Sequence, residues 1–416
     1  MAASSIATQC AIAGGGPAGM MLGFLLARAG VDVVVLEKHG DFLRDFRGDT
    51  VHPSTLELMY ELGLLDQFLR LPHSKVSHLT MQVGGENLTV DFSRLPTHCP
   101  FVALMPQWDF LDFLAGQGKR YRGFALRLRA EATDLIMDGG RVAGVKAKTP
   151  DGGLEIHADL TVACDGRHST LRERAGFHVD NLGAPMDVLW FRLSRRSSDG
   201  DETMGHIEAG RMMVMLNRTD YWQCAYLIPK SGIDAVKRAG LPAFRRAVAE
   251  MSPFMSDRVD EIRNWDDVKL LTVAVDRLRR WHRPGLLCIG DAAHAMSPIG
   301  GVGINLAVQD AVAAANMLAQ PLRDHAVTTA ILDAIERRRL LPTRVVQAVQ
   351  LTLQNRVIGP ALGSRGRLKP PLLFKLMRWP LLRRIPGRLF GLGIRPERVR
   401  TPDVLVSAPR RTRRAG

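Results

Sequence analysis

The chain has 416 residues, of which 46% are hydrophobic and 24% are charged, so it can form two or three packed domains and is not mainly disordered. It has no G-X-Y period, heptad run or internal repeat, which argues against a fibre or a solenoid. The formal net charge of +14 would suit a nucleic-acid-binding protein if the charge were spread over the whole chain.

The positive charge is instead concentrated near the C-terminus. Residues 365–414 contain 15 Lys or Arg but only two acidic residues, Glu397 and Asp403, which leaves 41 basic and 40 acidic residues in the rest of the chain. The body of the protein is therefore nearly neutral, and nucleic-acid binding through the basic tail is a distant alternative.

The cysteines and the N-terminus indicate the compartment. None of the five cysteines belongs to a CxxC pair, so we expect reduced thiols, a cytoplasmic protein and no metal site. The apolar residues 10–29 follow no basic segment and contain a glycine cluster, and we identify no charge-free apolar stretch that indicates a membrane span. The sequence therefore predicts neither a signal peptide nor a membrane span.

A glycine-rich turn lies near the N-terminus between two predicted strands. The apolar residues 6–13 lead into GGGPAG at residues 14–19, a helix follows over residues 20–29, and the β-branched residues 31–36 end at Glu37. The three spaced glycines allow a tight turn, close approach of a pyrophosphate and close helix packing, while the acid can accept from ribose hydroxyls. This pattern predicts a dinucleotide site.

Two later segments repeat the arrangement of a strand followed by a polar turn. Residues 160–163 lead into Asp165 and Gly166, and residues 285–289 lead into Gly290 and Asp291. Each aspartate could merely cap the turn after its strand. A proline and glycine-rich stretch at residues 298–303 then precedes a long predicted helix, and three ordered motifs are more specific than any one of them.

With these motifs the sequence resembles the class A flavoprotein monooxygenases, the family of para-hydroxybenzoate hydroxylase, over about residues 6–320. The resemblance implies an α/β fold, with a Rossmann-like FAD-binding domain of the GR2 type, an inserted, mostly antiparallel β-sheet domain for the substrate, and a helical C-terminal region. We expect the FAD-binding domain at residues 1–72, 100–180 and 276–320, the substrate-binding domain at 73–99 and 181–275, a helical, basic region at 321–406 and a disordered tail at 407–416.

The resemblance also assigns residues to the cofactor. It places the ADP half of FAD at the fingerprint and Glu37, the ribityl chain at Asp291, and the path of the nicotinamide donor at Asp165 and Gly166. The expected cofactor-binding residues are Gly14, Gly16, Pro17, Ala18, Gly19, Glu37, Lys38, Arg47, Gln107, Asp165, Gly166, Asp291, Pro298, Gly301, Val302, Gly303, Ile304 and Asn305.

The sequence shows no Ser-His-Asp, HExxH or paired-carboxylate motif, so the cofactor is expected to do the difficult chemistry. In the family, NADPH or NADH reduces FAD, O₂ forms a C4a-hydroperoxyflavin, and its distal oxygen is transferred to an aromatic, phenolic or quinone-like substrate, small or lipophilic. We expect the loop with Pro298, Gly300 and Gly301 to carry this chemistry, because its helix dipole favours anionic flavin. His52 is a further candidate, and His294 is expected to be a packed histidine.

Other enzyme classes are weighed against the same motifs. A prenyl-lipid reductase of the same superfamily would use them without a peroxide pocket, and it stays open as the alternative. A second glycine fingerprint is missing, which argues against reductases with two dinucleotide domains, and a WxWxIP segment is missing, which argues against flavin halogenases.

Apolar runs between residues 184 and 275 predict the strands of the substrate sheet, and residues 103–121 are predicted as one helix. Candidates for lining the cavity are Trp190, Met213, Met215, Trp222 and Tyr226, although such stripes are more often core.

Residues 365–400 mix cationic and apolar side chains in short pieces separated by prolines. They could lie in a membrane interface, which would make the protein peripheral at the inner face of the membrane, or pack on the body as a lid or dimer contact. Both alternatives stay open, as does the choice between monomer and homodimer.

Overall fold

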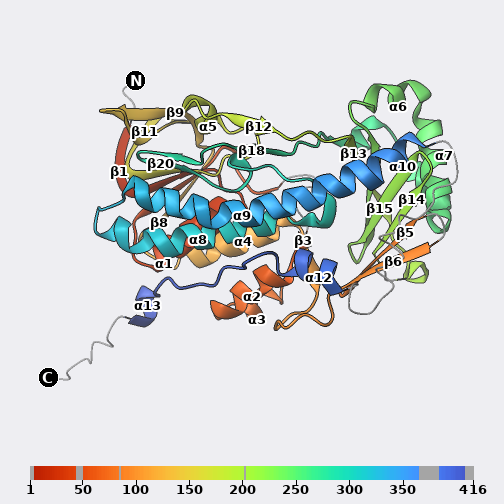
Figure 1. Cartoon of the computed structure of the whole chain (residues 1–416), viewed down its shortest axis with the longest axis horizontal. Helices are drawn as coiled ribbons and strands as arrows, with labels where there is room; N and C mark the ends of the chain where they lie inside the picture. The colour runs from red at the N-terminus through yellow and green to blue at the C-terminus, as the bar shows by residue number, and fades with distance from the viewer. Residues whose placement is uncertain (1–3, 44–49, 84–85, 201–202, 365–383, 408–416) are drawn as a thin grey trace.

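The computed structural model describes residues 4–43, 50–83, 86–200, 203–364 and 384–407. Two sheets lie one after the other along the long axis of the molecule, with helices in front of the larger sheet (Figure 1). The long helix α9 (Thr329–Leu353) runs from the larger sheet toward the smaller one. The α/β architecture expected from the sequence is therefore confirmed.

The larger sheet is the core of the dinucleotide fold. In the described residues it contains β1 (Ser4–Ala13), β2 (Val33–Glu37), β8 (Phe124–Leu128), β9 (Glu131–Asp138), β10 (Arg141–Thr149), β11 (Gly152–Ala163), β19 (His282–Arg283) and β20 (Leu286–Cys288). β1 lies between β2 and β11 in parallel, and β8 and β20 extend this parallel core on either side. Short turns at residues 139–140 and 150–151 join β9, β10 and β11 as antiparallel pairs.

The smaller sheet is mostly antiparallel, as expected. Its described strands are β5 (His78–Val83), β6 (Glu86–Asp91), β13 (Met186–Ser194), β14 (Met204–Glu208), β15 (Arg211–Asn217), β16 (Tyr221–Pro229) and β17 (Lys269–Leu271). One pair, β5 with β14, is parallel. We call this sheet the roof sheet.

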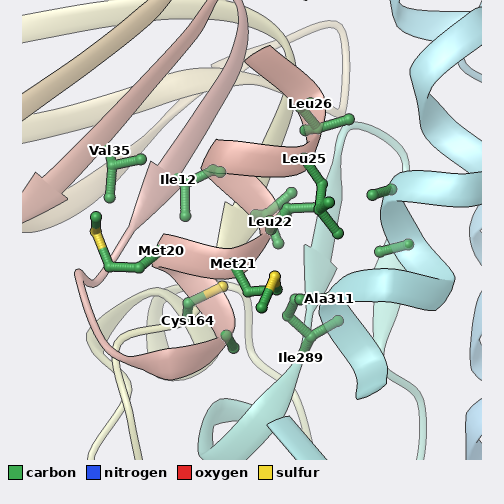
Figure 2. Close-up of a cluster of buried hydrophobic side chains, with 14 of the residues drawn as sticks. Ile12, Met20, Met21, Leu22, Leu25, Leu26, Val35, Cys164, Ile289 and Ala311 are labelled. Atoms are coloured by element: carbon green, nitrogen blue, oxygen red, sulfur yellow. The ribbon is translucent and has the colours of Figure 1, made fainter. Parts of the chain in front are cut away.

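Two helices form the main packing layer on the larger sheet. α1 (Pro17–Arg28) lies between the sheet and α8 (Gly303–Arg323). Figure 2 shows the α1 side chains Met21 and Leu25 on the side of Ala311 of α8 and Met20 next to Val35 of β2, and all five are buried. The segment Ile299–Arg323 is long and apolar enough to span a membrane, but 83% of its apolar window is buried inside the protein. In this structure it is a core helix.

The remaining described elements are short or lie at the edges. A three-stranded sheet joins β3 (Thr50–Val51), β4 (Ser74–Val76) and β7 (Val102–Leu104), and β12 (Val179–Asn181) pairs with β18 (Asp276–Leu278). The other helices are α2 (Pro53–Glu61), α3 (Leu65–Phe68), α4 (Gln107–Gly118), α5 (Thr170–Arg174), α6 (Ile233–Ala239), α7 (Leu241–Met251), α10 (Gly359–Gly363), α12 (Arg384–Gly391) and α13 (Val404–Ser407).

The prediction that residues 103–121 form one helix is wrong at the start of this range. Val102–Leu104 forms β7, which pairs with β3 and β4, and helix α4 begins only at Gln107. Pro106 explains the boundary, because a proline disfavours helical geometry in the residue before it and fits well at a helix start.

The C-terminal segment packs back on the body. Arg398 pairs with Glu61 of α2 at 3.0 Å, and the side chain of Asn316 on α8 donates to the carbonyl of Arg398 and accepts from the N–H of Arg400. For residues 384–407, packing on the body is therefore the observed alternative. Residues 365–383 lie outside the described residues, as does the predicted disordered tail at 407–416 except for Ser407, which ends α13.

A buried charge network joins helices α8 and α9. Asp310 on α8 is completely buried and accepts from the N–H of Gly290 at 3.1 Å, His294 Nε2 at 2.6 Å and Arg339 Nε at 2.8 Å. Arg339 on α9 also contacts Glu397 at 3.5 Å. Desolvation raises the pKa of Asp310, but His294 and Arg339 outweigh it and hold this pKa below its ordinary value. His294 is a packed, hydrogen-bonded residue, as expected.

Candidate functional site

A cavity of about 1090 Å³ lies between the carboxyl ends of the parallel strands and the roof sheet. It is continuous from the glycine fingerprint to the roof. The predicted cofactor residues that line it are Gly14, Gly16, Pro17, Ala18, Glu37, Lys38, Gln107, Asp165, Gly166, Asp291, Pro298, Gly301, Gly303 and Ile304.

The three fingerprint glycines have different physical roles. Gly14 has φ of +105°, and a Cβ atom there would lie 2.3 Å from the carbonyl oxygen of Cys164. A Cβ atom on Gly19 would lie 1.9 Å from the carbonyl oxygen of Gly14, so this glycine allows α1 to pack closely but does not line the cavity. Gly16 has no atom within 4 Å of such a Cβ, and it leaves open space on the cavity side. Only Gly16 is therefore free to face a ligand.

The N-terminus of α1 is open toward the cavity. No side chain caps this helix, its first turn has no acidic residue, and Pro17 stands at its first position. Glu37 at the end of β2 accepts from the backbone N–H of Gly15 at 3.1 Å and of His39 at 3.0 Å. An uncapped N-terminus with an acceptor beside it suits a pyrophosphate next to a ribose.

Asp165 caps a helix as well as lining the cavity. Its carboxylate accepts from the hydroxyl of Ser169 and from the backbone N–H of Leu171 at 3.1 Å, at the start of α5. The capping role considered from the sequence is therefore real for this residue. Arg172 of α5 donates to the carbonyl of Ala292, so it ties this motif to the one containing Asp291. Asp291 lines the cavity and lies 3.9 Å from Arg167.

Residues 297–303 form a loop at the start of α8, which we call the Pro298 loop. Gly300 has φ of +75° and Gly301 has φ of +62°, a region that favours glycine. Contacts also fix the loop, because a Cβ on Gly300 would lie 2.7 Å from the ring of Phe390, and Thr50 donates to the carbonyl of Gly301 at 2.8 Å. α8 begins with no side-chain cap and no acidic residue in its first turn. Its N–H groups and dipole therefore act on this end of the cavity.

His52 lies beside the Pro298 loop and is 2% exposed. Its Nδ1 lies 2.7 Å from the carbonyl oxygen of Phe390, which can only accept, so Nδ1 carries the proton. Nε2 is buried and has no hydrogen-bond partner among the described residues. Desolvation lowers the pKa of His52 to about 4, against the opposing effect of the carbonyls of Phe390, Gly300 and Gly301. The imidazole is therefore neutral near pH 7, with a lone pair on Nε2.

The roof sheet has two apolar faces, and only one lines the cavity. Trp190 lies in a row of paired residues with Ala225, Val214, Gly205 and Met81, and all five line the cavity. The neighbouring residues in each strand point the other way and pack against α7 and the segment Pro253–Glu261. Of the five roof candidates, Trp190 is confirmed. The other four candidates do not line the cavity, because they belong to the outer face; they are Met213, Met215, Trp222 and Tyr226.

Two further predicted residues do not line the cavity. Val302 packs with Met296, Leu306 and Val346. Asn305 accepts from the backbone N–H of His52 at 3.0 Å and from Thr55 at 2.7 Å, so it holds α2 against α8. Arg47 lies outside the described residues.

Sequence reasoning left one wall of the cavity open and missed another. The first comes from α12, in the segment that could pack on the body as a lid, and the second comes from α9 and the π-helical turn after it. Their described lining residues are Val349, Leu353, Val357, Ile358, Ile385, Pro386, Leu389 and Phe390. In α12 the apolar residues stand among exposed arginines, so composition drew attention to charge and not to the buried face.

The donor set fits FAD. Two uncapped helix N-termini, the open space at Gly16 and the acceptor Glu37 match the pyrophosphate, the flavin carbonyl region and the ribose of a dinucleotide. Within the described ranges, no group of three His, Cys, Asp or Glu residues is arranged to hold a metal ion. The five cysteines are buried free thiols.

Comparison with known proteins gives consistent matches. The sequence model of a family described as "FAD binding domain" matches residues 7–349. A 6-methylpretetramide 4-monooxygenase of Streptomyces rimosus is 32% identical over 399 residues, covering 95% of this chain and 94% of that enzyme. A para-nitrophenol 4-monooxygenase of Pseudomonas sp. (strain WBC-3) is 25% identical over 338 residues, covering 79% and 82% respectively.

Among solved structures, the anhydrotetracycline hydroxylase OxyS of Streptomyces rimosus superposes with a TM-score of 0.75. It covers 94% of this chain and 77% of that chain at 24% identity, which supports the shared fold.

Substitution of Gly16 tests the pyrophosphate site. Gly16 is the N-cap of α1 and has extended backbone geometry (φ −75°), so Gly16→Ala should lower the free energy of unfolding of the apoprotein by no more than about 1 kcal/mol. The new methyl group should raise the dissociation constant of FAD at least tenfold, as measured by fluorescence titration. Gly116→Ala, in α4 with open space around it, is the matched control and should leave FAD affinity unchanged. Unchanged FAD affinity in Gly16→Ala would contradict the assignment.

The buried state of His52 predicts a dependence of stability on pH. The pKa of His52 is about 4 in the folded protein and 6.5 in the unfolded chain. The contribution of the neutral imidazole to the free energy of unfolding is therefore fully present above pH 6.5 and is lost as the pH falls toward 4. Between pH 7.5 and pH 4, the difference in unfolding free energy between the wild type and His52→Gln should change by about 3 kcal/mol in favour of the variant. Urea unfolding of the apoproteins measures this. His98→Gln, at an exposed histidine, is the control, and parallel profiles for the wild type and His52→Gln would refute the prediction.

Proposed function

The chain belongs to the class A FAD-dependent aromatic monooxygenases, and we propose that it hydroxylates a lipophilic aromatic or phenolic substrate with NADPH or NADH and O₂. The observation that carries this proposal is one continuous cavity, which joins the FAD fingerprint, the Pro298 loop and an apolar roof. The cofactor and a substrate can therefore meet in one enclosed space.

The roof supports a lipophilic aromatic substrate. Its centre has the small residues Ala225, Val214 and Gly205, with Trp190 at one end of the row and Met81 at the other. This gives a broad apolar surface suited to a flat ring system. Two buried polar atoms among these walls, Trp190 Nε1 and Thr203 Oγ1, have no hydrogen-bond partner in the described structure. They could bind hydroxyl or carbonyl groups of such a ligand.

The relatives support the same substrate class. One is named for 6-methylpretetramide, another for para-nitrophenol, and others for anhydrotetracycline and rifampicin. The prenyl-lipid reductase is not favoured, because the relatives named here are monooxygenases or hydroxylases.

The residues of this chain bind and orient the reactants. When bound, FAD supplies the redox and oxygen-transfer chemistry. The N-terminus of α8 favours negative charge where it meets the cavity, because its first N–H groups and its dipole are directed there. His52 Nε2 can accept a hydrogen bond from a phenolic hydroxyl, which would increase the electron density of the ring.

Exclusion of water is the task of the wall formed by α12. Helix α12 places Leu389 and Phe390 against the cavity, and the carbonyl of Phe390 accepts from His52. Close packing holds this helix, because a Cβ atom on Gly387 would lie 2.2 Å from the carbonyl oxygen of Asp91. Exclusion of water from the cavity protects reactive intermediates from hydrolysis and strengthens electrostatic contacts.

Peripheral membrane association through residues 365–400 and the oligomeric state stay predictions. Residues 384–400 are engaged with the body of the protein, so any contact with lipid would depend mainly on residues 365–383. Flotation of the protein with anionic liposomes is the corresponding measurement.

The proposed activity is tested first by spectroscopy. The purified protein should show flavin absorbance that bleaches on anaerobic titration with NADPH or NADH and returns when air is admitted. Aromatic substrates should then accelerate NAD(P)H oxidation, with product formed in place of hydrogen peroxide. Bleaching without any return in air would contradict a monooxygenase.

The roof should discriminate ligands by size. Val214→Phe adds a ring at the centre of the row, so it should weaken binding of 2-naphthol at least tenfold more than binding of phenol. Both affinities are measured from the perturbation of the flavin absorbance of the holoenzyme. Met215→Leu, on the outer face of the same strand, should leave the ratio unchanged. Equal losses for both phenols would show that Val214 does not set the size limit.

A further inference from the structure

The Pro298 loop is held from one side by amide side chains of α9. Gln350 accepts from the backbone N–H of Ser297 at 3.2 Å, and its Nε2 donates to the carbonyls of Ser297 at 3.0 Å and of Ile299 at 2.8 Å. Gln354, one turn later, donates to the hydroxyl of Ser297 at 2.6 Å. Both glutamines are completely buried. Gln350 thus pairs with the loop backbone as a neighbouring strand would.

These hydrogen bonds replace contacts that the loop does not make by itself. Ile299–Gly301 forms only a short 3-10 turn that is broken at the left-handed Gly300, so other buried carbonyls of the loop need outside partners. On the opposite side Thr50 donates to Gly301, and together with α9 it fixes the loop from two directions.

The helix has an unusual geometry at this point. The α-helical part of α9 ends at Leu353, and Gln354–Ile358 is a π-helical turn. Such turns are rare and occur often at functional sites. The adjoining ridge of the same helix, with Val349, Leu353 and Val357, lines the cavity. One helix therefore contacts both the loop and the space next to it.

We propose that Gln350 and Gln354 are positioning residues that set the conformation of the Pro298 loop for the bound flavin. They do so through the backbone of Ser297 and Ile299 and the Ser297 hydroxyl. The loop in turn aims the N-terminus of α8 at the cavity. This inference rests on the FAD site and not on the class of substrate, so it can fail while the proposed substrate stands.

The neighbouring glutamine offers a matched control. Gln347 lies one turn earlier on the same buried face, but its amide contacts Asp276, Arg277 and Ala295 and not the Pro298 loop. Gln347→Leu and Gln350→Leu therefore remove equivalent buried amides from one helix. Only the second change leaves Ser297 and Ile299 without their partners.

The test compares FAD binding and flavin properties of the holoenzymes. Gln350→Leu should raise the dissociation constant of FAD at least tenfold and move the midpoint potential and visible circular dichroism of bound FAD toward those of free FAD. Gln347→Leu should change the dissociation constant less than twofold and leave the spectrum as in the wild type. Equal effects of the two variants would overturn the proposal, because they would show only a general weakening of α9.

A conservative variant separates positioning from folding. In Gln350→Glu the buried carboxylic acid, when protonated, has the shape of the amide and keeps the acceptor and one of its two donations, and burial raises its pKa. FAD affinity and dichroism of this variant should lie closest to the wild type at low pH and depart from it as the pH rises. A flat pH profile relative to the wild type would overturn the proposal, even if Gln350→Leu does not fold.

Discussion

The arrangement of the site depends on one buried carboxylate. Asp310 accepts hydrogen bonds from the backbone N–H of Gly290, the imidazole of His294 and the guanidinium of Arg339. It thereby joins the turn at Gly290, helix α8 and helix α9. Because a buried charge is costly unless it is fully paired, these three elements can adopt only the spacing that satisfies it. Through Arg339 the same network reaches Glu397 and places the C-terminal segment. The positions of the cavity walls on these elements therefore depend on the hydrogen bonds of Asp310.

The site uses backbone more than side chains. Glycines at positions 14, 16 and 19 allow close approach, two helix N-termini are left without caps, and the Pro298 loop is kept in a left-handed conformation by packing. Side chains then act mainly on this backbone, as Asp165, Asn305 and Gln350 show. This division agrees with an enzyme whose reactive group is a cofactor, because the protein must supply shape, dipoles and dryness.

The sequence motifs of the FAD-binding domain could be recognised because each depends on a few neighbouring residues. A left-handed glycine or a proline-started helix leaves a short pattern that is independent of the rest of the fold. The sequence predicted the roof strands but not which face meets the cavity, since both faces of β15 and β16 are apolar and alternation gives no signal. The role of Gln350 was invisible, because a buried amide and a solvated one look alike in a sequence. Helix α12 was hidden by its arginines.

The position of Phe390 has a consequence for how the enzyme is made. Its ring packs at Gly300 and its carbonyl holds His52, yet it is translated long after the fingerprint at residues 14–19 and the loop it covers. A nascent chain can thus complete the parallel sheet and present a dinucleotide site while one wall of the reaction chamber is still inside the ribosome. The wall that contains Phe390 can therefore be added only after the fingerprint and the Pro298 loop have been synthesised.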